Sequence, residues 1–145
     1  VVKDVSDRVS GKADYESLRD GTAVPSHGVP VTEPRPGERY SGPFDMYTSD
    51  GINGDIHIQF HRFGPRCPLH PAIQNQVHIA FVTDDIKGYL EGKQVIMPLY
   101  EPFPGYRAAM ILLDGCPVEI IETTLSEEEI WGKPHSRTVL YPDAE

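Results

Sequence analysis

The run VHIAFVTDD at residues 77–85 contains one histidine near its start and two aspartates at its end. Its apolar, branched and aromatic residues predict a buried β-strand, and the aspartates can cap a helix that follows. A second apolar run, PVEIIE at 117–122, carries Glu119 near its centre. An unpaired charge inside a buried strand is costly. His78 and Glu119 therefore suggest metal ligands that share the inner face of one sheet.

The rest of the second half continues this pattern. After the strand at 76–83, the sequence predicts a helix at about 84–91 and strands at 94–98, 106–113 and 117–123. The order of elements in this half is therefore β-α-β-β-β.

The first half resembles a worn version of the same unit in its order of elements. Strands are expected at about 25–31, 44–48 and 55–63. Residues 32–37 cannot be helical, because three prolines lie within or just before them. The helix of this half is therefore shortened or missing. Residues 64–71, with three prolines, are expected to link the halves.

These elements divide the chain into four parts. Ser126, followed by three glutamates, fits the start of a short C-terminal helix. The parts are an N-terminal arm or extra segment at 1–24, a first, degenerate module at 25–71, a second module at 72–124, and a C-terminal helix and tail at 125–145.

The clearest alternation in the first half lies at 55–63. Its apolar residues point one way and its polar residues, His57, Gln59 and His61, point the other way. The amide oxygen of Gln59 is a hard, neutral ligand that suits a divalent ion. His57 and His61 would line the same pocket, or one of them would replace Gln59 as ligand.

The composition is that of a globular domain with many turns. The chain has 145 residues, 14 prolines, 13 glycines and a net charge of −9. This charge argues against nucleic acid and against anionic membranes as partners. No stretch has the apolar length of a membrane span. Two cysteines, Cys67 and Cys116, form no disulfide framework, so a reducing, cytoplasmic location is expected.

Three stretches resemble the vicinal oxygen chelate superfamily, which has the glyoxalase and bleomycin-resistance fold. Residues 78–85, 105–115 and 117–122 are similar in order and spacing to its "HxAFxVDD", "G…AFIxDxxG" and "PIExxE" patterns. The match covers 76–123 well and the first half more loosely. The resemblance implies an α+β fold, in which two βαβββ-type modules form a cup-shaped mixed sheet.

Each module of that family places one ligand on its first strand and one on its last. The matching positions here are His27 and Gln59 in the first module, and His78 and Glu119 in the second. This set resembles methylmalonyl-CoA epimerase more than bacterial glyoxalase I, in which a glutamate usually takes the place of Gln59. A second register remains open, because 2–18 also resembles a family opening. In that register the first ligand lies upstream of Val1.

The resemblance implies a metal-dependent enzyme that catalyses proton transfer next to a carbonyl of a small, oxygen-rich substrate. It would be an isomerase, an epimerase or a glyoxalase-type lyase. One divalent ion (Zn, Ni, Co, Mn or Fe) would bind vicinal substrate oxygens, and Glu119 or a nearby carboxylate would move the proton. Relatives commonly pair, so a homodimer is expected.

Two alternatives compete with this interpretation. The first is a metal-free protein that binds or sequesters a small molecule, as bleomycin-resistance members do. The second is a structural zinc site formed by Cys67 and His70 with His57 and His61. Residues four apart on a strand are about 13 Å apart, which is too far for His57 and His61 to bind one ion.

Overall fold

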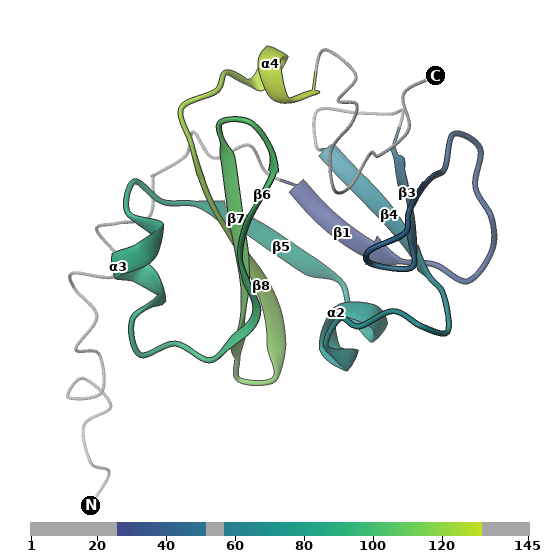
Figure 1. Ribbon diagram of the computed structural model, residues 1–145, viewed down its shortest axis with the longest axis horizontal. Helices are drawn as coiled ribbons and strands as arrows, with labels where there is room; N and C mark the ends of the chain where they lie inside the picture. Colours follow the sequence, from purple (N-terminus) through teal and green to yellow (C-terminus); the bar gives the residue numbers. More distant parts are fainter. Residues whose placement is uncertain (1–25, 52–56, 132–145) are drawn as a thin grey trace, which may run out of the picture.

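The computed structural model describes residues 26–51 and 57–131, which form one mixed sheet and a few short helices (Figure 1). The eight strands lie in the order β2-β3-β4-β1-β5-β8-β7-β6, and the sheet curls into a half-barrel. The prediction of an α+β, cup-shaped mixed sheet is therefore confirmed at this level. The strands are β1 Ser26–Pro30, β2 Arg39–Ser41, β3 Met46–Asp50, β4 His57–Phe63, β5 His78–Val82, β6 Val95–Phe103, β7 Tyr106–Leu113 and β8 Cys116–Thr123.

The two halves of the sheet have the same internal order. In each half the first strand pairs in parallel with the last: β1 with β4, and β5 with β8. The remaining pairs within each half are antiparallel. At the centre β1 and β5 run antiparallel and join the halves, with His27 opposite Ile79 and Gly28 opposite His78. This junction sets which residues of the first half share a face with His78.

The predicted helix of the second half is α3, Ile86–Leu90, and it lies on the convex side of the sheet. Asp85 is its N-cap, and its carboxylate accepts a hydrogen bond from the Gly88 amide. Ile86 and Tyr89 pack against buried side chains of β7 and β8. Residues 31–38, which connect β1 to β2, contain no helix, as the prolines predict.

A short helix, α2 (Pro71–Asn75), lies at the end of the segment that was expected to be only a linker. Pro71 occupies the first turn, where a missing amide hydrogen is harmless. His70 caps the helix, because its Nδ1 accepts a hydrogen bond from the Ala72 amide at 3.0 Å. Ile73 is buried and anchors α2 to the sheet.

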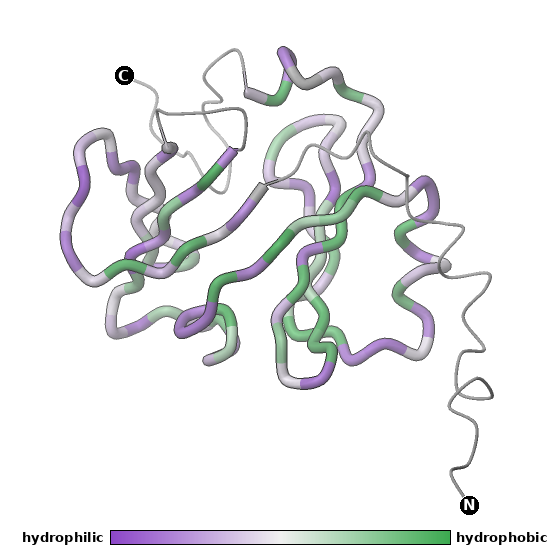
Figure 2. Tube along the Cα trace, turned by 180° about the vertical axis from the view of Figure 1, so that it is seen from behind, coloured by the Kyte–Doolittle hydropathy of each residue, from purple (hydrophilic) through white to green (hydrophobic). Residues whose placement is uncertain are grey.

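Apolar side chains pack at two places on the concave side. An upper cluster, near α4 in Figure 1, consists of Ala80, Val82, Phe103, Tyr106, Ala108, Ile121 and Ile130. A lower cluster, near α2, consists of Ile73, Met97 and Met110, with Phe44, Phe63 and Leu69 against it. Figure 2 shows the apolar residues along the strands of the second half. The polar residues described below lie between these clusters.

The C-terminal helix α4, Glu127–Trp131, begins where the sequence predicts it. Ser126 and Glu129 form a capping box: the Ser126 amide donates to Glu129 Oε2, and the Glu129 amide donates to Ser126 Oγ. The expected arm at 1–24 and the tail beyond 131 lie outside the described residues. Within the described ranges, no helix has the length and apolar character that a membrane span needs.

Candidate functional site

The polar residues of the site project from the concave face of four central strands. Gly28 on β1 pairs with Gln59 on β4 and with His78 on β5, so Gln59 and His78 flank Gly28 on one face. Glu119 on β8 pairs with Ala80, two residues after His78, and projects to the same face. The register therefore brings three of the four predicted ligands onto one surface.

His78 and Glu119 form a direct pair. His78 Nε2 lies 3.4 Å from Glu119 Oε2, and the side chains are only 8% and 17% exposed. The carboxylate thus has a partner in a partly buried place, as a charge in an apolar strand requires. The pair can share a proton, or it can present a nitrogen and an oxygen together to a ligand.

Gly28 makes room for the His78 imidazole. A β-carbon added at Gly28 would lie 1.9 Å from Cε1 of His78, well inside contact distance. The ring therefore lies against the backbone of β1. The sequence prediction did not include Gly28, although a glycine inside a strand often marks such a close approach.

The imidazole of His61 lies beside that of His78. The two rings are nearly parallel, with centroids 6.1 Å apart. His61 is buried, and its Nδ1 lies 3.0 Å from Thr48 Oγ1. Burial, followed by repulsion from His78, lowers the pKa of His61 to about 3. His61 therefore carries no charge at neutral pH, and it lies on the same face as Gln59, two residues before it on β4.

Asp50 on β3 holds the side chain of Gln59. The two residues are opposite in the register, and Gln59 Nε2 donates to Asp50 Oδ1 at 3.2 Å. This bond orients the amide at the exposed side of the site. The sequence prediction missed both Asp50 and Thr48, because β3 could be placed only approximately.

His57 contacts the C-terminal helix. Its ring stacks on Trp131 of α4, with centroids 4.3 Å apart and planes 5° from parallel. His57 is on the same face as Gln59 and His61, because it lies two and four residues before them on β4.

The structure does not bring His27 to the other predicted ligands. His27 pairs with Ile79, whose side chain lies on the opposite face from His78. Its Nδ1 is buried and has no hydrogen-bond partner among the described residues. The physical reason is that side chains alternate between the two faces of a strand. On β1, Gly28 and not His27 pairs with His78.

The residues fit a divalent ion only in part. Ligand atoms about 2.1 Å from an ion in tetrahedral geometry are roughly 3.4 Å apart, close to the His78–Glu119 separation. However, no three His, Cys, Asp or Glu side chains within 26–51 and 57–131 lie close enough together to hold a metal. An amide ligand such as Gln59 is the remaining candidate for a third position.

The rival zinc set is also not assembled in the part of the chain that the structure describes. Nδ1 of His70 caps α2, and His57 stacks on Trp131. Cys67 is a free thiol, and burial raises its pKa, which disfavours the thiolate that zinc would need.

The chain matches no protein-family model, and no curated protein matches it.

Proposed function

We propose that the protein is an enzyme that moves a proton next to the carbonyl of a small, oxygen-rich substrate. It would act as an isomerase, an epimerase or a glyoxalase-type lyase. The observation that carries this proposal is the His78–Glu119 pair on the concave face, 3.4 Å apart and bordered by apolar side chains. A carboxylate on a concave, partly apolar face is within reach of a substrate proton when a small molecule binds there.

Glu119 is the proposed base. Its carboxylate takes a proton from the carbon beside the carbonyl, and the electron pair of that C–H bond moves to the carbonyl oxygen. Glu119 then returns the proton from the same side to the neighbouring carbon, which gives isomerisation, whereas an epimerase would need a second acid on the opposite side. His78 holds the carboxylate in position through their contact.

The walls of the site favour this chemistry. The neutral ring of His61 narrows the space beside His78 without adding a charge. Apolar side chains lie above and below the polar residues, and the low exposure of His78 and Glu119 strengthens electrostatic interactions between them and a ligand.

One divalent ion (Zn, Ni, Co, Mn or Fe) belongs to this proposal. Bound, it would supply a Lewis acid for vicinal substrate oxygens. His78 and Glu119 would hold it, with Gln59 as the third candidate. His27 is no longer included in the set, because it projects from the other face.

The second candidate function is a metal-free protein that binds a small molecule. Two observations favour it: the four predicted ligands do not converge, and the pair of His78 and Glu119 is already satisfied. Such a protein would use the concave face only for its shape and apolar walls.

One experiment separates these two functions. Protein purified without chelator is analysed for metal and then incubated in D₂O with 2-oxo acids, 2-hydroxy acids and their thioesters. An enzyme of the proposed type exchanges the hydrogen beside the carbonyl, and Glu119→Gln abolishes this exchange. Tight binding of a compound by a protein that takes up none of the five metals and exchanges no hydrogen would establish the binding function instead.

The two-module organisation, the homodimer and the cytoplasmic location remain parts of the proposal. The matching strand order of the halves supports two modules. Val77, just before β5, and Ile79 and Phe81 on β5 alternate along the chain and are 54%, 44% and 41% exposed, which supports burial against a second copy. Light scattering tests this: a particle of one chain at micromolar concentration would contradict the dimer.

A further inference from the structure

Helix α4 is held firmly at the top of the half-barrel (Figure 1). The capping box of Ser126 and Glu129 fixes its first turn, and Ile130 is buried in the upper cluster. Trp131 packs against the same cluster. The fold itself therefore sets the position of Trp131.

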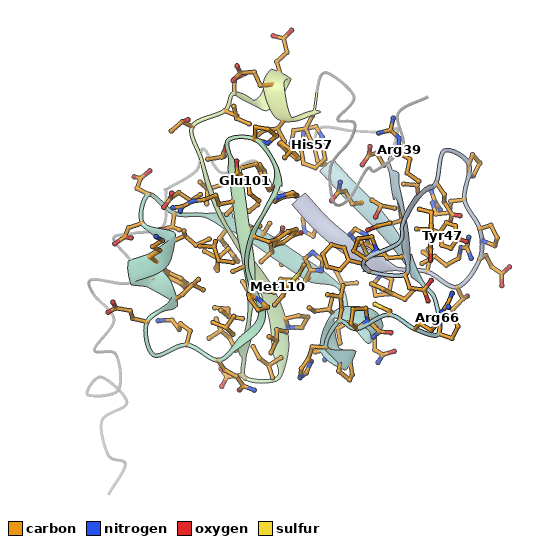
Figure 3. The ribbon with its side chains drawn as sticks, viewed as in Figure 1. Arg39, Tyr47, His57, Arg66, Glu101 and Met110 are labelled. Carbon is orange, nitrogen blue, oxygen red and sulfur yellow. The ribbon has the colours of Figure 1, made fainter. Side chains whose placement is uncertain are left out.

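Trp131 contacts both walls of the half-barrel. On one side its indole stacks on His57 of β4, which lies below α4 in Figure 3. On the other side it packs against the upper cluster, whose residues come mainly from β5, β7 and β8. The indole thus spans the concave face at one end.

His57 and two residues of the upper cluster are one layer away from the polar residues of the site. His57 lies two residues before Gln59, Ala80 two residues after His78, and Ile121 two residues after Glu119. Two residues along a strand correspond to about 6.6 Å, and residues two apart share a face. Because Trp131 stacks on His57, it lies about one such layer from Gln59 along the concave face.

The indole nitrogen of Trp131 has an unused hydrogen. Nε1 is buried and has no hydrogen-bond partner among the described residues. A buried donor without an acceptor destabilises the folded state, and an acceptor that reaches it removes this cost. A tryptophan that served only for packing would normally have its N–H paired or exposed.

We propose that Trp131 is a ligand-binding residue, which closes the concave site above His78 and Glu119 and donates its indole N–H to an oxygen of the ligand. The ligand class is a small molecule with an additional acceptor oxygen, a carbonyl or a carboxylate, beyond the oxygens at the His78–Glu119 pair. The inference rests on the proposed function only in taking the concave face as the binding site.

The chain offers a direct probe, because Trp131 is its one tryptophan. A ¹⁵N-labelled sample therefore gives a single indole N–H resonance, and the His78 ring resonance is assigned with His78→Ala. Acetohydroxamate and pyruvate, each with adjacent oxygens, are titrated into the protein as purified. We expect saturable shifts of both resonances, with the indole proton moving downfield as it forms a hydrogen bond.

Two variants separate the hydrogen bond from packing. Trp131→Phe keeps an aromatic ring but removes the donor, and it should weaken binding about 3- to 10-fold, the usual effect of one neutral hydrogen bond. Phe103→Leu disturbs the same cluster without removing a polar atom, and it should weaken binding less than about 2-fold. Melting temperatures show whether both variants fold.

The outcomes are distinct. A shift of the His78 resonance without a shift of the indole overturns the inference and leaves the proposed site. Equal weakening by Trp131→Phe and Phe103→Leu also overturns it, because packing then explains the effect. If neither resonance moves with either probe, both proposals fail. If the indole shifts while Glu119→Gln leaves hydrogen exchange in D₂O unchanged, the inference stands and the enzymatic role of Glu119 falls.

Discussion

The imidazole of His78 lies directly against the backbone of Gly28, where a β-carbon would come within 1.9 Å of its Cε1 atom. Both residues are central: Gly28 belongs to the first half of the chain and His78 to the second, and they are opposite in the β1–β5 register. The contact between the halves thus fixes the ring of a proposed ligand.

Gly28→Ala should displace His78 and impair the site. A methyl group forced into a packed place costs about 1–3 kcal/mol, and a misplaced ligand typically loses 10- to 100-fold in metal affinity. Urea denaturation and metal titration measure the two effects. Gly42→Ala is the matched control, since nothing lies within 4 Å of its added β-carbon. In a His78→Ala background the cost of Gly28→Ala should largely disappear; an unchanged cost would refute the contact.

Two glutamates three residues apart on β8 should behave oppositely. Glu119→Gln removes the proposed base and the anionic ligand, so metal content and turnover should fall while the melting temperature barely changes. Glu122 instead accepts hydrogen bonds from the Ile86 amide, at the start of α3, and from Arg107. Glu122→Gln should therefore lower stability by about 1 kcal/mol and retain the metal. Loss of metal from Glu122→Gln but not from Glu119→Gln would show that Glu122, and not Glu119, is the metal ligand.

The strands and helices of the second half were predicted well from the sequence, because several independent signals agree there. The apolar run before Asp84 and Asp85 is long enough to indicate a strand, and Asp85 does cap α3. Ser126 and Glu129 likewise form the expected capping box. Where local preference and burial pattern agree, prediction needs no knowledge of the tertiary fold.

The first half was harder to predict, because the sequence of a short strand says little about which of its residues face each side of the sheet. β1 has five residues, and a shift of one residue exchanges its two faces. His27 and Gly28 are adjacent, so sequence alone favoured the histidine, whereas the pairing with β5 places the glycine in the site. The roles of Asp50, Thr48 and Trp131 arise from contacts between distant segments, which a single sequence does not display.

His61 should make the protein sensitive to acid. In the unfolded chain a histidine binds a proton near pH 6.5, whereas the pKa of folded His61 is about 3. Between these values the unfolded state binds more protons, so stability falls as pH decreases through this window. The slope from one such group approaches about 1.4 kcal/mol per pH unit.

His61→Gln tests this directly, because the amide can still bond to Thr48 but does not titrate. Urea denaturation at pH 7, 6, 5 and 4.5, with chelator present to exclude metal release, should give a flatter dependence for the variant. The same slope in both proteins would show that His61 is not buried in its neutral form.

Gln59→Glu tests the third candidate ligand. In wild type Gln59 Nε2 donates to Asp50 Oδ1, so a glutamate at this position faces a carboxylate. The two like charges should raise the pKa of one of them and lower the stability of the metal-free protein. Asp50→Asn combined with Gln59→Glu removes this repulsion and leaves an anionic group at the site.

In this double variant, a metal held by His78 and Glu119 should bind more tightly, as measured by competition with a chelator. Turnover should nevertheless fall, since the added negative charge opposes the negative charge that develops on the substrate oxygen. If the double variant binds metal no more tightly than Asp50→Asn alone, Gln59 is a lining residue and the site has only two protein ligands on the concave face.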